Sequence, residues 1–221
     1  MKESVTGGGR YPPPLRHPAE PHLVYGFDAL CGWCFGFVPA MRAVGEAHPD
    51  LPVVLALPGL VTGERVGPYA EMETYIRGAS ERLRAVTGRA PSDAFFELIR
   101  RSGVRGDSGP PTAAMAWVRR HAPDQLLAFA HAITEAHFER GADLNDPATH
   151  EAAMAELGID APSPELGDQT LVQREWAAGR ALGIQSFPTL AFVRGEKAEV
   201  MPSRYEPAMV TAWVGERLSA T

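Results

Sequence analysis

The only two cysteines of this 221-residue chain stand three positions apart, in the motif Cys31-Gly32-Trp33-Cys34. Two cysteines placed at random would show this spacing in roughly one of 100 placements. Cysteines this close can exchange disulfides: one thiolate attacks a disulfide, and the second thiol then resolves the mixed disulfide that forms. The motif therefore indicates a redox-active dithiol whose own disulfide is the reacting group.

The segments around the pair predict that the first cysteine lies at a helix N-terminus. Residues 23–27 indicate a short buried strand, and residues 35–44 a helix that Pro39 should kink. At such a helix N-terminus, free N–H groups and the positive end of the helix dipole stabilise a thiolate. We therefore expect Cys31 to be the attacking thiol and Cys34 the resolving thiol.

The rest of the chain predicts two α/β halves separated by helices. The apolar run 53–57 makes the order strand, helix, strand, which requires a parallel pair. An apolar stripe then predicts a helix of about five turns; its residues are Tyr69, Met72, Ile76, Ala79, Leu83 and Val86. Four more helices are expected near residues 93–101, 112–121, 124–140 and 147–157.

After a loop at residues 160–167 the α/β pattern returns. Asp168 should cap a helix over residues 169–182, and Gly183 should end it. The apolar runs 189–193 and 198–201 flank a short turn and predict a hairpin, which can only be antiparallel. A last helix is expected over residues 206–218. The parallel pair and the antiparallel hairpin together predict a mixed sheet.

Composition and charge exclude several classes of function. The apolar fraction of 45% is that of a globular protein, and the net charge of −6 argues against binding to nucleic acid. No stretch reaches the roughly 18 apolar residues of a membrane-spanning helix. Residues 1–21 hold glycine and proline triplets without an apolar run, which predicts a flexible tail, no secretory signal and a cytoplasmic location.

Four features of the chain now carry a resemblance to a known family. Phe27 stands four residues before the first cysteine, Pro39 stands five after the second, and the segment 183–190 contains Phe187-Pro188-Thr189. With the cysteine motif, these residues make the chain resemble the thioredoxin superfamily and, within it, the DsbA-like branch of protein-disulfide isomerases.

The resemblance implies an α/β fold, namely a thioredoxin fold with a mixed sheet (βαβ, then ββα) and a large all-helical insertion. On this expectation, residues 22–62 and 166–221 form the thioredoxin-like domain. Residues 63–165 form the inserted helical subdomain, and residues 1–21 the tail.

The resemblance also assigns the site. It implies a cis peptide bond before Pro188, with the backbone of Phe187 pairing with an extended substrate and Trp33 adding an aromatic binding surface. Gly32 and Trp33, the residues between the cysteines, would tune the redox couple.

Two positions depart from the family pattern. Tyr25 occupies the position of the buried acid of thioredoxin, and the spacer lacks the histidine of DsbA. The nearest acid is Asp28, for which two interpretations remain: it modulates Cys31, or it is a solvated loop residue.

The resemblance implies an enzyme, a thiol-disulfide oxidoreductase or isomerase acting on protein or low-molecular-weight disulfides. Its partners would be those substrates and a recycling redox partner. No cofactor is expected beyond the disulfide, with a low-molecular-weight thiol as candidate co-substrate. No metal site is predicted, because there is no second CxxC motif and His131 and His137 fall on different helix faces.

Two alternatives remain open. Kappa-class glutathione transferases and 2-hydroxychromene-2-carboxylate isomerases share this fold and insertion, although they characteristically have serine at the position of Cys31. A redox-sensing binding protein without turnover would use the same groove.

Overall fold

The computed structural model describes residues 20–220, so the predicted tail lies outside the described residues except for its last two positions. Its main sheet has four strands in the order β2-β1-β5-β6. These are β1 His22–Gly26, β2 Val53–Ala56, β5 Thr189–Arg194 and β6 Lys197–Val200. Strand β1 is parallel to β2 and antiparallel to β5, which is antiparallel to β6. This topology confirms the predicted mixed sheet.

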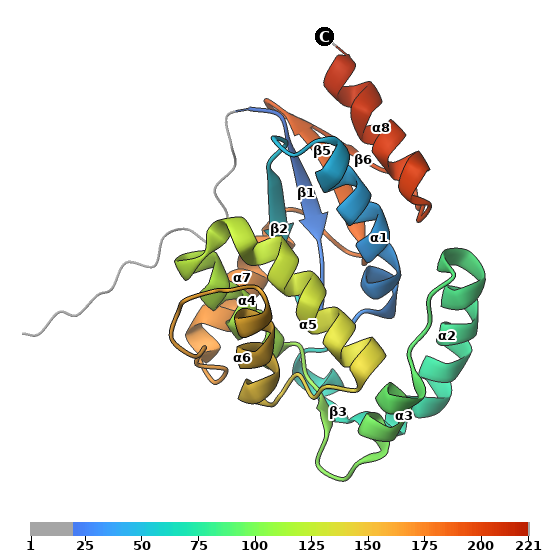
Figure 1. The fold of residues 1–221 in the computed structure, drawn as a ribbon, viewed down its shortest axis with the longest axis vertical. Coiled ribbons are helices and arrows are strands. Elements are labelled where there is room, and N and C mark those ends of the chain that lie inside the picture. The colour runs from blue at the N-terminus through green and yellow to red at the C-terminus, as the bar shows by residue number, and fades with distance from the viewer. Residues whose placement is uncertain (1–19, 221) are drawn as a thin grey trace, which may run out of the picture.

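Helices cover the sheet because alternate side chains of each strand point to opposite faces. On one face, Leu23 and Tyr25 of β1 belong to the main core, over which α1 (Gly32–Ala47), α5 (Leu126–Arg140) and α8 (Pro207–Ser219) pack. On the other face, Val24 joins a smaller apolar cluster that contains Ile184. Helix α7 (Gln169–Ala181) contacts β2. Strand β1 is thus buried on both sides and forms a rigid support for the segment that follows it (Figure 1).

The segment between β2 and α7 is mainly helical, as predicted. Besides α5 it contains α2 Glu73–Thr87, α3 Asp93–Arg100, α4 Gly109–His121 and α6 Pro147–Glu156, with 3-10 turns η1 Gly63–Arg65, η2 Tyr69–Met72 and η3 Pro123–Gln125. It also holds a small antiparallel pair, β3 Gly67–Pro68 with β4 Arg105–Gly106. The sequence did not predict this pair, because strands of two residues have no periodicity.

Helix α7 begins and ends where the sequence predicted. The carboxylate of Asp168 accepts a hydrogen bond from the Leu171 N–H at 2.9 Å, which caps the helix N-terminus. Gly183 follows the helix with a φ of 73°, a left-handed conformation that glycine adopts without steric cost. These two residues fix the direction in which the chain enters the segment before β5.

The helix of about five turns that the apolar stripe predicted is divided into two elements. Its first turn is the separate 3-10 segment η2, and α2 starts only at Glu73. Two members of the stripe are exposed, Met72 at 46% and Val86 at 57%. The stripe does not face a core along its whole length, since its middle part, including Ile76 and Ala79, lines a cavity. Within residues 20–220, no helix is long and apolar enough to cross a membrane.

Candidate redox site

Cys31 occupies the N-cap position of α1, directly after the buried strand β1 and a short turn. Its backbone is extended, with φ −86° and ψ 111°, and its carbonyl oxygen accepts the first helical hydrogen bond from the Phe35 N–H at 3.0 Å. The Cys31 N–H donates to the carbonyl of Asp28 at 3.1 Å. The turn and the helix thus place Cys31 at the N-terminus of α1, the end of a helix that favours negative charge.

Cys34 lies in the first turn of α1 and is the more deeply buried thiol, at 0% exposure against 5% for Cys31. Both cysteines are free thiols in this structure. Burial raises the pKa of the Cys34 thiol well above its ordinary value, and the hydrogen bond and charge of Cys31 raise it further. The Cys34 thiol therefore stays protonated at neutral pH.

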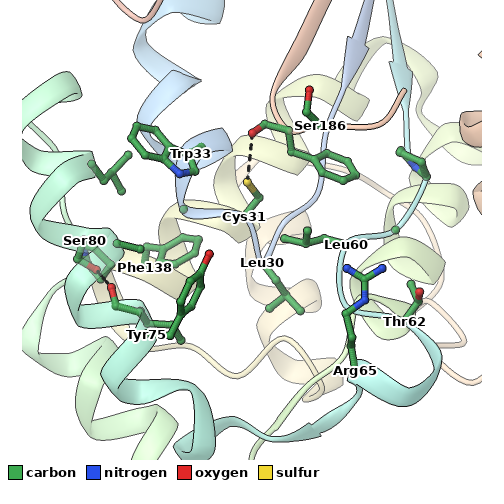
Figure 2. A pocket seen from close by; sticks show the side chains of 18 of the residues that line it. Leu30, Cys31, Trp33, Leu60, Thr62, Arg65, Tyr75, Ser80, Phe138 and Ser186 are labelled. Atoms are coloured by element: carbon green, nitrogen blue, oxygen red, sulfur yellow. Dashed lines mark hydrogen bonds between the residues drawn. The ribbon is translucent and has the colours of Figure 1, made fainter. Parts of the chain in front are cut away.

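The segment before β5 lies beside the cysteine pair. The peptide bond between Phe187 and Pro188 is cis, in agreement with what the resemblance implied. The Cys31 thiol donates to the Phe187 carbonyl oxygen over an S···O distance of 3.9 Å, drawn as a dashed line in Figure 2. Two segments far apart in the sequence thus form one site.

Asp28 is buried, at 3% exposure, so its interpretation as a solvated loop residue is wrong. Its Oδ1 accepts from the Leu30 N–H at 2.9 Å, and its Oδ2 accepts from the Leu60 N–H at 2.8 Å. Burial raises the pKa of Asp28, while these two donors oppose the rise. The carboxyl group ties the turn before Cys31 to the loop after β2.

Tyr25 is fully buried on β1, where thioredoxin has an acid. Burial raises the pKa of its hydroxyl well above the ordinary value, and the charges of Cys34 and Cys31 raise it further. The hydroxyl therefore stays protonated at neutral pH. It cannot accept a proton from Cys34 as a buried carboxylate could.

Trp33 packs against an aromatic residue that the sequence did not single out. Its ring centroid lies 5.3 Å from that of Tyr205, which precedes α8. Burial, with the charges of the two cysteines, raises the pKa of Tyr205 to about 12. A Cβ at Gly32 would make only an ordinary 3.5 Å contact with Leu83, so packing does not require glycine at this position.

A cavity of about 470 Å³ opens beside Cys31. One wall comes from α2 and includes Tyr75, Ile76 and Leu83. Figure 2 shows Thr62 and Arg65 on the opposite side, beyond the Cys31 sulfur. Three further lining residues were not predicted because they belong to no motif: Thr62, Arg65 and Arg180. Gln185 also lines the cavity; it lies in the segment 183–190 but was not predicted as a site residue.

Among residues 20–220, no group of three histidine, cysteine, aspartate or glutamate side chains could hold a metal ion. His131 and His137 are buried in α5, and burial lowers their pKa values to about 3 and about 4. Their imidazoles are neutral core groups. Neither lines the cavity.

Together, the mixed sheet, the helical insertion and the cysteine pair define a DsbA-like thioredoxin fold with a CxxC motif. No family model and no curated protein matches the sequence. Solved structures do match it, and they include thiol-disulfide oxidoreductases.

The cytosolic disulfide reductase DsbM from Pseudomonas aeruginosa is 27% identical, with a TM-score of 0.79 over 89% of this chain and 98% of that one. A second structure of DsbM, with GSH, aligns to this chain at 25% identity, with a TM-score of 0.76 over 90% of this chain and 100% of that one. A periplasmic thioredoxin-like protein from Salmonella enterica serovar Typhimurium, 16% identical with a TM-score of 0.53 over 96% and 94%, shares the fold.

Proposed function

We propose that this protein is a thiol-disulfide oxidoreductase that works as a disulfide reductase in the cytoplasm. The observation that carries the proposal is the position of the Cys31 sulfur, at the N-terminus of α1, at the edge of a cavity and beside the Phe187 carbonyl. An attacking thiolate needs this combination of stabilisation and access. The likeness to DsbM, a cytosolic disulfide reductase, supports the direction and the compartment.

In the proposed reaction, the Cys31 thiolate attacks one sulfur of a substrate disulfide. A bond forms between Cys31 and that sulfur, the substrate S–S bond breaks, and the other half leaves as a thiolate. Cys34 then loses its proton to solvent and attacks the Cys31 sulfur, which releases the second half. The enzyme is left with a Cys31–Cys34 disulfide, and the substrate has gained two electrons.

Return to the dithiol requires two electrons from a reductant. We propose that two molecules of a low-molecular-weight thiol supply them. The first attacks the Cys31–Cys34 disulfide and forms a mixed disulfide with one cysteine. The second attacks the small-thiol sulfur of that mixed disulfide, which leaves a free dithiol and one small disulfide. Two observations support this chemical class. The cavity has the size of a small-molecule site, and DsbM has been solved with GSH.

The remaining site roles follow from the contacts. Cys34 is the resolving thiol because it is buried behind Cys31 and retains its proton until Cys31 is in a mixed disulfide. Phe187 offers its backbone to the substrate chain, and Trp33 forms an aromatic edge of the cavity. Asp28 holds the turn that carries Cys31.

A turnover assay tests the proposal. Wild type, Cys31→Ser and Cys34→Ser would be compared for reduction of bis(2-hydroxyethyl) disulfide, with glutathione as reductant and the oxidised glutathione measured. We expect wild type to turn over the disulfide. We expect the turnover rate of Cys31→Ser to be lower by at least about a hundredfold, since the serine hydroxyl is not ionised at neutral pH. Equal activity in all three proteins would refute the dithiol mechanism and favour glutathione conjugation or binding without turnover.

A further inference from the structure

The cavity beside Cys31 carries an uneven distribution of charge. Among the described residues that line it there are two arginines, Arg65 and Arg180, and no aspartate, glutamate, lysine or other charged side chain. The chain as a whole has more acidic than basic residues, with a net charge of −6. The charged side chains that line the cavity are therefore both cations, in a chain whose net charge is negative.

Arg65 has a guanidinium group that is available for a ligand. It lies in η1 and is exposed, and within residues 20–220 no hydrogen bond or ion pair engages its guanidinium. Figure 2 shows it on the side of the cavity opposite Trp33 and Tyr75. Several other arginines are paired with carboxylates, as Arg89 is with Glu139 at 2.6 Å.

Arg180 is held in place by the backbone. It lies near the end of α7, and one guanidinium nitrogen donates to the Pro58 carbonyl at 3.2 Å, which leaves its other N–H groups for a ligand. Pro58 and Gly59 line the same cavity. The cavity is therefore lined by one anchored cation and by one cation whose guanidinium has no partner among residues 20–220.

The opposite wall is apolar. Ile76, Ala79 and Leu83 of α2 face the cavity, and Trp33 borders it near the cysteine. A ligand that fills the cavity thus meets the Cys31 sulfur, the apolar side chains of α2, and the guanidinium groups of Arg65 and Arg180. Guanidinium groups bind carboxylates in bidentate geometry, with stronger hydrogen bonds than neutral donors make.

We infer that Arg65 and Arg180 form a carboxylate-binding subsite that makes the enzyme selective for small thiols and disulfides carrying carboxylates. The inference rests on the proposed function and adds the substrate class and the residues that select it. The mechanism is electrostatic: the subsite attracts the anionic end of the ligand while its sulfur lies at Cys31. Its contribution should therefore decrease as added salt screens the charges.

The first experiment compares two disulfides, oxidised glutathione and bis(2-hydroxyethyl) disulfide, which has no charge. Each is reduced by the dithiol form of wild type, Arg65→Gln, Arg180→Gln and the double variant, and the second-order rate constant is measured. The matched control is Arg82→Gln, which removes an exposed α2 cation that does not line the cavity.

For oxidised glutathione we expect each single variant to lose about tenfold, and the double variant more, because hydrogen bonds to charged groups are removed. For the uncharged disulfide we expect the rate constants of these variants to change by less than about twofold. We expect the same for Arg82→Gln with either disulfide. Equal losses for both disulfides would assign the arginines a structural role and overturn the inference. So would unchanged rates with oxidised glutathione.

A binding measurement separates this inference from the proposed function. S-methylglutathione keeps both carboxylates but cannot exchange, so its dissociation constant is measured by calorimetry in wild type and in the double variant. Weaker binding in the variant, with a smaller salt dependence, supports the subsite even if no disulfide turns over. Equal binding overturns it, even if the turnover assay supports the reductase.

Discussion

The Cys31 sulfur lies 3.9 Å from the carbonyl oxygen of Phe187, although the two residues are 156 positions apart in the chain. Strand β1 delivers Cys31 to the N-terminus of α1, and Phe187 precedes β5, which pairs with β1. The pairing of these two strands therefore builds the site. The helical insertion between them supplies the α2 wall of the cavity.

Replacing Asp28 should loosen the turn before Cys31. The Asp28 carboxyl group accepts hydrogen bonds from the N–H groups of Leu30 and Leu60, whereas an asparagine amide has one acceptor oxygen and turns its NH2 group toward the other donor. We expect Asp28→Asn to lower the free energy of unfolding by about 1–3 kcal/mol. Urea denaturation measures this, with the exposed Asp160→Asn as control. A value equal to wild type would contradict the proposed role.

Gly179 should not tolerate a side chain. A Cβ at this position would lie 2.6 Å from the backbone nitrogen of Pro58, in the loop that also carries the cavity residue Gly59. We expect Gly179→Ala to destabilise the protein by about 1–3 kcal/mol, because the backbone must move.

The matched control for this change is Gly45→Ala, in α1, where a Cβ meets nothing within 4 Å. Alanine is the better helix former there, so we expect Gly45→Ala to stabilise by about 0.5–1 kcal/mol. Thermal unfolding of both variants gives the signs. If both variants shifted the melting temperature in the same direction, the result would contradict the close packing of α7 against the loop that contains Pro58.

Acid should destabilise the protein through its buried histidines. Burial lowers the pKa of His131 to about 3 and that of His137 to about 4, whereas an unfolded histidine titrates near 6.5. Between these values the unfolded chain binds more protons, so the free energy of unfolding falls as the pH falls from about 6.5 toward 4. Over this pH range, one such histidine lowers the free energy of unfolding by about 1.4 kcal/mol for each pH unit of acidification.

The variant His131→Phe isolates this contribution. Phenylalanine can keep the ring contacts with Tyr25 and Phe27, which lie at centroid distances of 6.5 Å, but has no group to protonate. Urea unfolding at several values between about pH 7 and pH 4.5 should show a smaller acid-induced loss in the variant, by about 1 kcal/mol per unit. Parallel pH profiles would rule out His131 as a source of the acid sensitivity.

The sequence predicted the parts of the site that are carried by short motifs. The spacing of Cys31 and Cys34, with a strand before them and a helix after, was enough to predict the N-terminal position of Cys31. The Phe187-Pro188 segment was located through a family resemblance, since the type of a proline bond cannot be read from composition.

Other features depend on contacts between distant segments and left no local signal. Asp28 follows a strand in a turn, where solvation is common, and its contact with Leu60 joins segments 32 residues apart. The apolar stripe predicted a helix but did not indicate that Ile76 and Ala79 line a cavity. Arg65 lies in η1 and Arg180 in α7, and only the fold makes both of them line that cavity.

The central claim, that Cys31 attacks and Cys34 resolves, is tested most directly by mass spectrometry of the trapped intermediate. Cys34→Ser and Cys31→Ser would be incubated with oxidised glutathione, quenched with acid and digested. We expect a glutathione adduct on Cys31 in Cys34→Ser, and little or none on the buried Cys34 in Cys31→Ser. An adduct on Cys34 alone, or none on either cysteine, would contradict it.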